Sequence, residues 1–325
     1  MRPVPSGVVL ALDAGGSTTR ALVLDPAGHP LGRAASGPGN PSAVGVEAAL
    51  VSVREAVSQA LAGAGAAVAD VRSTVLASAG SDRLVPRETL IGHLGLDPGA
   101  PFRRVSDLLA MFHSAADTDT GAALVAGTGS VAARVRGGGL ERVVGGNGWL
   151  LGDAGAGFWI GREVARAVTD DLDGTGAVTA LTPALLAEFG LSDDRRPREG
   201  RAFVLGEIVD LVHAAEPVRL ARLAPACFTA AAAGDSVATA IVAAAQEELA
   251  VLVRAVEGPG PLVVGGGVWR RSAQGPLAPG LRAALTGRTV LPAEDGLLGA
   301  ASLALRALGL PTAPLRALRG TGRPA

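Results

Sequence analysis

Short apolar runs, each ended by a turn rich in Gly, Asp or Pro, mark the start of the chain and predict a meander of three β-strands. A longer stretch follows in which Val46, Leu50 and Val53 recur at helical spacing, which predicts an amphipathic helix. Two more strands separated by a helix come next, and a further helix opens at Asp107. In order, the expected elements are strands near 7–13, 18–25 and 30–36, a helix over 43–62, and strands at 71–80 and 102–106.

The second half of the chain repeats this opening. Another three-strand meander is predicted, with Gly137-Gly138-Gly139 as one of its turns. A mostly helical insertion of about 157–258 then separates the meander from the next strand. Because the repeat is as long as a domain, it indicates a duplication rather than a solenoid. The expected strands lie near 121–126, 130–136, 140–145, 261–267 and 288–292, and a last helix covers 294–308.

Two loops carry the strongest chemical signal. One runs through Asp13-Ala-Gly-Gly-Ser-Thr18 and the other through Ala126-Gly-Thr-Gly-Ser130, each directly after an apolar strand. Glycine lets the backbone approach an anion closely, free N–H groups can point toward it, and Ser or Thr hydroxyls add donors. Two such loops in a duplicated chain predict that one polyphosphate is bound from both sides.

The sequence contains no lysine. A P-loop is therefore excluded, because its G-x-x-x-x-G-K-[ST] pattern needs one, and so is the protein-kinase set with its strand lysine. No G-x-G-x-x-G follows a predicted strand either. Any bound phosphate must then be held by glycine and hydroxyl loops, together with a metal ion held by a carboxylate.

Composition narrows the class of protein further. At 325 residues, with 48% hydrophobic and 18% charged, the chain is expected to form about two well-packed domains. Its net charge of −1 argues against a nucleic-acid or membrane-surface partner recruited by charge. No signal peptide and no apolar stretch long enough to cross a bilayer is recognised. Cys227 is the only cysteine, which excludes internal disulfides and points to a cytoplasmic protein. The four histidines show no metal-ligand spacing and are expected in turns or at the surface.

Four segments, in a fixed order along the chain, together resemble the sugar kinases of the actin, hexokinase and Hsp70 superfamily. More narrowly, the chain is similar to the N-acetylglucosamine kinase and BadF/BcrA ATPase branch, and the resemblance covers nearly its whole length. The segments are D-A-G-G-S-T-T-R at 13–20, V-S-D at 105–107, A-G-T-G-S at 126–130 with G-W-L-L-G-D-A-G-A-G-F-W-I-G at 148–161, and V-V-G-G-G-V-W at 263–269.

This resemblance implies an α/β fold of two ribonuclease-H-like, actin-like ATPase domains with a cleft between them and a helical insertion in the second. The first domain is expected over 1–117, with the C-terminal helix at about 294–309 returning to it, and the second over 118–293. The implied function is transfer of the γ-phosphoryl group of ATP to an N-acetylhexosamine, with the 6-hydroxyl of N-acetylglucosamine as the expected acceptor. The implied ligands are ATP, Mg²⁺ and a small sugar, and a homodimer is left open.

For the nucleotide, the resemblance assigns the phosphates to the two loops and adenosine to a third glycine-rich turn. Asp13 is expected to hold Mg²⁺ through water, because this ion prefers one or two carboxylates together with waters and phosphate oxygens. The residues expected at the nucleotide are Gly15, Gly16, Ser17 and Thr18 in the first loop, Gly127, Thr128 and Gly129 in the second, and Gly265 and Gly266 in the third.

For the acceptor, Asp107 matches the general base of related sugar kinases, since a carboxylate can take the hydroxyl proton as the bond to phosphorus forms. The alternative is that Asp107 is only a helix N-cap. Asn40, Gly129, Asp153 and Ala156 are expected to line the sugar, whose hydroxyls are good hydrogen-bond donors. The resemblance also allows Asp153 to support the magnesium site. Asp153 could instead only cap the following helix, and Asn40 could be an ordinary loop residue.

Several other functions are weighed against this one. N-acetylmuramic acid, glucosamine or glucose could be the acceptor, because Ala79-Gly80-Ser81 and Pro41-Ser42 depart from the sugar-contacting pattern of relatives. A non-catalytic sugar or nucleotide sensor would not need both Asp13 and Asp107. An activator of 2-hydroxyacyl-CoA dehydratases needs two cysteines per subunit for a shared iron–sulfur cluster, and a ROK-type kinase needs a zinc-binding cysteine cluster. One cysteine satisfies neither.

Overall fold

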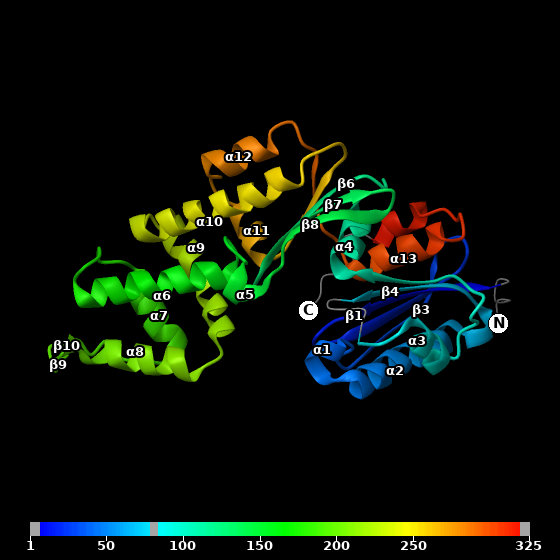
Figure 1. The fold of residues 1–325 in the computed structure, drawn as a ribbon, viewed down its shortest axis with the longest axis horizontal. Helices are drawn as coiled ribbons and strands as arrows, with labels where there is room; N and C mark the ends of the chain where they lie inside the picture. The colour runs from blue at the N-terminus through cyan, green and yellow to red at the C-terminus, as the bar shows by residue number, and fades with distance from the viewer. Residues whose placement is uncertain (1–6, 79–83, 319–325) are drawn as a thin grey trace. The chain divides into compact units, whose positions relative to one another are not determined.

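The computed structural model describes residues 7–78 and 84–318, which fold into two compact units (Figure 1). Unit 1 holds the chain up to Asp119, Gly137–Gly139, and the chain from Leu291 onward. Unit 2 holds Thr120–Arg136 and Leu140–Val290. Each unit contains a five-stranded sheet, so the expected α/β fold of two related units is confirmed.

The sheet of unit 1 has the strand order β3-β2-β1-β4-β5. The first three strands form an antiparallel meander, while β4 pairs in parallel with β1, and β5 in parallel with β4. The central strands are largely buried on both faces because helices cover both sides of the sheet. The bounds are β1 Val8–Ala14, β2 Thr19–Leu24, β3 Pro30–Ser36, β4 Val71–Ser78 and β5 Phe102–Ser106.

Helices α2 and α3 cover one face of this sheet, and α4 and α13 cover the other (Figure 1). Although α13 comes from the far end of the chain, it packs closely on α4. A Cβ at Gly299 would lie 1.7 Å from the Ala110 carbonyl oxygen, so only glycine fits there. The bounds are α1 Pro41–Val44, α2 Val46–Ala64, α3 Arg87–Leu94, α4 Asp107–Ala115 and α13 Gly296–Arg306, with 3₁₀ turns at Val68–Asp70 and Ala313–Leu318.

Unit 2 repeats the layout with the order β12-β11-β6-β7-β8. Its meander of β6, β7 and β8 is followed, after the insertion, by β11, which lies parallel to β6. The β7–β8 turn uses Gly137 and Gly138 at φ of 57° and 69°, the left-handed angles that a tight hairpin needs. The bounds are β6 Gly121–Ala126, β7 Ser130–Arg136, β8 Gly139–Gly145, β11 Leu262–Gly265 and β12 Val290–Pro292.

The insertion between β8 and β11 is mostly helical, as expected, and its helices share an apolar core that includes the fully buried Cys227. A small hairpin of β9 and β10 was not expected. The helices are α5 Gly148–Leu151, α6 Gly157–Asp173, α7 Leu181–Phe189, α8 Phe203–Ala214, α9 Ala224–Ala232 and α10 Ser236–Ala255, with a 3₁₀ helix at Pro217–Leu223. The hairpin strands are Pro197–Arg198 and Arg201–Ala202, and α11 Gly267–Ser272 and α12 Pro279–Leu285 follow β11.

Within the described ranges, α10 alone is long and apolar enough to cross a membrane by length and composition. Its sequence is not one uninterrupted apolar run, because it contains the charged residues Glu247, Glu248 and Arg254. Leu249 and Val253 on its inner face are fully buried. The helix packs against α6, α9 and α12, as a core helix does.

His113 corrects the expectation that all four histidines lie in turns or at the surface. It lies in α4 and is completely buried, with its ring edge-to-face against Phe112. Neither ring nitrogen has a hydrogen-bond partner among the described residues. The expectation failed because α13 closes over α4, and this long-range contact leaves no local sequence signal.

Candidate active site

The first glycine-rich loop joins β1 to β2 at the carboxyl end of β1. The Gly15 N–H donates to the Thr18 carbonyl at 3.0 Å and closes the turn. A Cβ on Gly15 would lie 3.2 Å from the same carbonyl oxygen, so a larger residue would strain it. Gly16, Ser17 and Thr18 are exposed, and no hydrogen bond among the described residues uses their N–H groups. These donors are therefore available to an anion.

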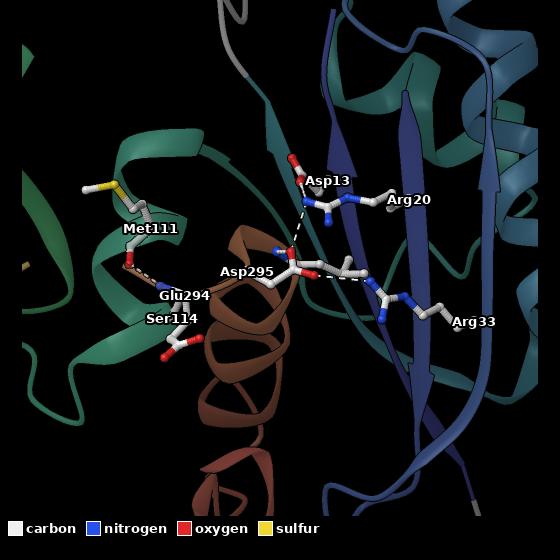
Figure 2. A network of polar contacts seen from close by, with 8 residues as sticks. Asp13, Arg20, Arg33, Met111, Ser114, Glu294 and Asp295 are labelled. Carbon is white, nitrogen blue, oxygen red and sulfur yellow. Dashed lines mark hydrogen bonds and ion pairs between the residues drawn. The ribbon is translucent and has the colours of Figure 1, made fainter. Parts of the chain in front are cut away.

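Asp13 lies beside this loop, opposite Arg20 of β2. The Arg20 Nη2 contacts the Asp13 carboxylate and also Asp295 Oδ1, the latter at 2.9 Å, and Arg33 Nη2 lies 3.1 Å from Asp295 Oδ2 (Figure 2). Burial raises the pKa of the Asp13 carboxyl, Arg20 opposes that shift, and the negative charges of Asp295 and Asp107 add to it. A neighbouring cation therefore favours the ionised form of Asp13.

The donor set at Asp13 fits an ion such as Mg²⁺. Across residues 7–78 and 84–318, no cluster of three or more His, Cys, Asp or Glu side chains could hold a metal. Mg²⁺ does not need such a cage, because it keeps several waters and takes one or two carboxylates plus phosphate oxygens. A single carboxylate beside a turn with free N–H donors meets that requirement.

The sheet register places Asp107 near Asp13. Asp13 is level with Ala77 of β4, and Ala77 is level with Val105 of β5. Strands in a sheet lie about 4.8 Å apart, so the ends of β1 and β5 are separated by about 10 Å at the same edge of the sheet. Two carboxylates and the first loop thus share the carboxyl edge of unit 1.

Helix α4 begins with two oxygen-bearing side chains. Ser106 is the N-cap, because its hydroxyl oxygen accepts a hydrogen bond from the Leu109 N–H at 3.2 Å. The alternative in which Asp107 is the N-cap is therefore wrong. Asp107 is the first helical residue and is exposed, and its Oδ1 accepts from the Leu108 N–H at 2.8 Å. The positive end of the helix dipole favours a negative charge there.

Asn40 is tied to the first loop. Its backbone N–H donates to the Gly15 carbonyl at 3.1 Å, and its Oδ1 accepts from the Ser42 N–H at 3.0 Å, which caps α1. Among the described residues, none accepts a hydrogen bond from its Nδ2, so that amide can donate to a ligand. Ala79-Gly80-Ser81, where the sequence departs from the pattern of relatives, lies outside the described residues.

The second loop, between β6 and β7, is held by Asp153. The Ser130 N–H donates to Asp153 Oδ1 at 3.1 Å, and the Ser130 hydroxyl donates to the Ala154 carbonyl at 2.9 Å. A Cβ on Gly129 would lie 2.6 Å from Asp153 Oδ2, so a larger residue there would displace the Asp153 carboxylate. Asp153 adopts a left-handed φ of 59°, which Asp tolerates better than most residues. It is not the N-cap of α6, which is the fully buried Ala156.

The start of α6 fixes the rest of this loop. The Gly127 N–H donates to the Gly129 carbonyl at 2.9 Å, and the Gly157 N–H donates to the Gly127 carbonyl at 2.8 Å. The Phe158 N–H reaches the Thr128 carbonyl at 3.0 Å. Thr128 is exposed at the tip. The loop is thus held at its base, with its tip open to solvent.

The third glycine-rich turn follows β11 and adjoins the second loop. Gly266 has a φ of 98°, and a Cβ there would lie 2.2 Å from the Ala126 carbonyl oxygen at the end of β6. The requirement for glycine at 266 therefore comes from the protein's own backbone. A Cβ on Gly267 would meet only Arg270 Nη2, at 3.9 Å. Gly265 and Gly267 are half-exposed beside it.

The sequence interpretation missed Arg20 and Asp295. Asp295 follows the pattern of an N-cap before an apolar helix, and its Oδ1 does accept from the Leu297 N–H at 3.0 Å. That signal locates a helix start but not its neighbours. The contact with Arg20 depends on where α13 packs, which no local pattern gives.

Two five-stranded units with matching strand orders, each with a glycine-rich loop after its first strand, define a protein of the actin-like ATPase and sugar-kinase fold. A solved structure shares the fold: a candidate N-acetylglucosamine kinase from Chromobacterium violaceum, with a TM-score of 0.69 and 26% identity, covering 93% of this chain and all of that one. The chain belongs to the BadF/BadG/BcrA/BcrD ATPase family, whose model matches residues 10–304.

Two curated relatives are sugar kinases. The N-acetyl-D-glucosamine kinase of Dictyostelium discoideum is 26% identical over 266 residues, which cover 77% of this chain and 79% of the relative. The glucosamine kinase GspK of Vibrio cholerae serotype O1 is 29% identical over 234 residues, which cover 70% of this chain and 73% of the relative.

Proposed function

We propose that this protein is an ATP-dependent kinase that phosphorylates the 6-hydroxyl of N-acetylglucosamine. The observation that carries the proposal is the carboxyl edge of the unit 1 sheet. There the free N–H groups of the first loop, the Asp13 carboxylate and the exposed Asp107 carboxylate lie at the ends of aligned strands. Membership in an ATPase family and the two kinase relatives support the same activity.

In this proposal the two loops bind the phosphates of ATP. The exposed N–H groups of Gly16, Ser17 and Thr18 serve one loop, and Thr128 lies at the tip of the other. Donors already fixed in place favour the charge that develops on the transferring group, since they do not have to reorganise during the reaction. Mg²⁺ bound at Asp13 would supply positive charge to the phosphate oxygens. Gly265–Gly267 would lie against adenosine.

Asp107 is the proposed general base. The sugar hydroxyl oxygen forms a bond to the γ-phosphorus, the bond from that phosphorus to the bridging oxygen of ADP breaks, and the hydroxyl proton passes to the Asp107 carboxylate. Mounting the carboxylate on the first residue of α4 fixes its direction, and orientation of the reacting groups is a large part of such catalysis.

Asn40 and Asp153 are the proposed sugar contacts. The Nδ2 amide of Asn40 can donate to a ring oxygen or to the acetamido carbonyl. Asp153 uses Oδ1 to hold the Ser130 N–H, which leaves its remaining lone pairs for sugar hydroxyls. We propose that the enzyme works in the cytoplasm.

Glucosamine is the second candidate acceptor, because one of the relatives is a glucosamine kinase. A pocket that hydrogen-bonds the acetamido group should reject sugars lacking it, since its own polar groups would be left unpaired.

An ADP-release assay with Mg²⁺ and a panel of sugars tests the proposal. We expect kcat/KM for N-acetylglucosamine to exceed that for glucose by at least about tenfold, which corresponds to roughly 1.4 kcal/mol. A higher kcat/KM for glucosamine, N-acetylmuramic acid or glucose would show that this sugar, and not N-acetylglucosamine, is the acceptor. ATP binding without ADP release on any sugar would identify a sensor and contradict the kinase assignment.

A further inference from the structure

Arg20 occupies an unusual position for an arginine beside a candidate metal ligand. It extends from β2 between two carboxylates, Asp13 at the end of β1 and Asp295 before α13 (Figure 2). One nitrogen, Nη2, contacts both carboxylates. A divalent cation approaching Asp13 would therefore meet a carboxylate that already carries a guanidinium.

Asp295 is held more firmly than Arg20. Its side chain is only 9% exposed, against 29% for Arg20. Its Oδ1 caps α13 through the Leu297 N–H at 3.0 Å, and its own carbonyl accepts from the Leu298 N–H at 2.9 Å. The movable partner of this contact is thus the long arginine side chain, which has several rotatable bonds, and the fixed partner is Asp295.

Two further contacts fix the position of Asp295. Arg33 of β3 holds its Oδ2 at 3.1 Å. The preceding residue, Glu294, donates its N–H to the Ser114 hydroxyl at 3.0 Å, and that hydroxyl donates to the Met111 carbonyl at 2.7 Å (Figure 2). Ser114 and Met111 belong to α4, the helix that begins with Asp107. Asp295 therefore presents Oδ1 to Arg20 from a rigid frame.

The charges around Asp13 suggest how a cation could bind there. The negative charges of Asp107 and Asp295 act on Asp13, and Arg20 contacts the Asp13 carboxylate directly. A divalent cation that binds at Asp13 repels the guanidinium and competes with it for Oδ2, the Asp13 oxygen that Arg20 Nη2 contacts. A second carboxylate within reach lets the guanidinium move without losing its ionic partner, so less free energy opposes metal binding.

We propose that Arg20 is the resident counter-ion of Asp13 and moves fully to Asp295 when a divalent cation binds, so that Asp295 is a positioning residue that sets metal affinity without being a ligand. This inference rests on the proposed role of Asp13 as the metal-binding carboxylate. In this exchange, the Arg20 guanidinium passes from Asp13 to Asp295. Arg33 keeps Oδ2, the second carboxylate oxygen of Asp295, occupied.

A double-mutant cycle on full-length protein tests the exchange without turnover. Protein saturated with the non-hydrolysable analogue AMPPNP is titrated with Mn²⁺, and free Mn²⁺ is measured by electron paramagnetic resonance. Asp295→Asn keeps an oxygen that can cap α13 but removes the charge. We expect it to weaken Mn²⁺ binding by about fivefold or more in the presence of Arg20, and by less than about twofold in an Arg20→Gln background.

Arg20→Gln alone should tighten Mn²⁺ binding, because it removes the competitor. Asp25→Asn is the matched control: it removes a carboxylate from the opposite end of β2, where Asp25 contacts His29 rather than Arg20. Its Mn²⁺ affinity should equal that of the unmodified protein. If Arg20→Gln fails to fold, Arg20→Lys serves instead, since a lysine lacks the planar fork of arginine and should also shrink the effect of Asp295→Asn.

Equal weakening by Asp295→Asn in both backgrounds would mean that Asp295 acts by its own charge or as a ligand, and would overturn the exchange. No weakening in either background would overturn it as well. Asp13→Ala separates this failure from that of the proposed function. If Asp13→Ala leaves Mn²⁺ affinity unchanged, the metal role of Asp13 itself is wrong, whatever the cycle shows.

Discussion

Ser106 and Asp107 stand next to each other at the start of α4 and have separable tasks. Ser106 stabilises the helix end through the Leu109 N–H, whereas the Asp107 carboxylate is exposed. Asp107→Asn keeps the size of the side chain and an acceptor oxygen but removes most of its basicity. We expect kcat to fall by about 10²-fold or more, within the range for loss of a general base, with ATP affinity nearly intact. Steady-state kinetics with N-acetylglucosamine measure both.

Ser106→Ala is the matching control for that variant. It should lower the free energy of unfolding by about 1 kcal/mol, the usual cost of losing an N-cap, and change kcat far less than Asp107→Asn does. A wild-type kcat in Asp107→Asn, with lost stability instead, would show that Asp107 serves only the helix.

His113 gives the protein a built-in sensitivity to acid. Burial holds the pKa of its imidazole at about 4, against an ordinary value of 6.5; positive Arg306 and Arg103 lower it further and Asp119 opposes them. Below pH 6.5 the unfolded chain takes up a proton that the folded protein refuses, so stability falls as the pH drops from about 6.5 toward 4. The loss reaches about 3 kcal/mol, and above pH 6.5 this residue has no effect.

His113→Leu removes the titrating group together with two ring nitrogens that lack partners among the described residues. Its stability at pH 7 should stay close to that of the unmodified protein, because no hydrogen bond of the ring is lost. Urea unfolding at pH 7 and pH 4.5 should show that the free energy of unfolding falls less between these pH values in the variant than in the unmodified protein. An identical drop in both proteins would assign the acid sensitivity to other groups.

For single residues, the sequence predicts the roles of those that lie in short motifs. It does not predict contacts between residues that are far apart in the chain. Asp13, Asp107 and the glycines of the loops stand in short patterns that can be recognised without a structure. Asp295 meets Arg20 only because α13 packs on α4, and His113 is buried for the same reason. Contacts of this kind depend on residues far apart in the sequence, and no local pattern encodes them.

The turn after β11 shows why neighbouring glycines in one element are not equivalent. A Cβ on Gly266 would collide with the carbonyl of Ala126, whereas a Cβ on Gly267 would meet only Arg270 Nη2, at an ordinary contact distance of 3.9 Å. Gly267→Val should therefore leave the fold intact and, if adenosine lies against this turn, raise KM for ATP by roughly tenfold, which is about 1.4 kcal/mol. ATP titrations in the kinase assay, with a thermal melt of each variant, measure the effect.

Gly266→Ala serves as the contrasting variant. Its Cβ would lie 2.2 Å from the Ala126 carbonyl, so it should lower the melting temperature rather than act on ATP alone. An unchanged KM for ATP in a stable Gly267→Val protein would show that adenosine binds elsewhere.

Elements were more predictable than single contacts. The strands and long helices follow from alternation, helical spacing and turn residues, and Gly137 and Gly138 form the hairpin that their sequence predicts. The β9–β10 hairpin could not be predicted, because each strand has only two residues and the segment has no apolar run. The sequence predicts a sharp turn at Asp153. The hydrogen bond from the Ser130 N–H to Asp153 depends on the left-handed backbone of Asp153, which the sequence alone does not predict.

For the whole molecule, the two sheets have matching orders, β3-β2-β1-β4-β5 and β8-β7-β6-β11-β12, as expected for a duplication. Helix α13 completes unit 1, and Gly299 allows its close approach to α4. Gly299→Ala would put a methyl group 1.7 Å from the Ala110 carbonyl and should cost about 3 kcal/mol, since overpacking at a backbone contact forces the helices apart. Hydrogen exchange should show lost protection in β1, β4 and α4, with β6 and α10 unaffected.

Gly63→Ala is the control for that substitution. Gly63 is exposed in α2, and the nearest atom to an added Cβ would be 3.9 Å away. This change should stabilise the helix slightly, because alanine has the higher helix propensity. Equal loss of protection in both units for Gly299→Ala would contradict the assignment of α13 to unit 1.

The placement of α13 also bears on the order in which the protein is made. Ser114 receives its hydrogen bond from Glu294, 180 residues later in the chain. A ribosome adds about 5–20 residues per second, so the part of the first sheet that α13 covers remains exposed for roughly 10–40 s while unit 2 is being synthesised. During that interval the apolar surface that α13 will cover is open to chaperones or to other nascent chains. The half of the protein that is translated first therefore completes its fold last.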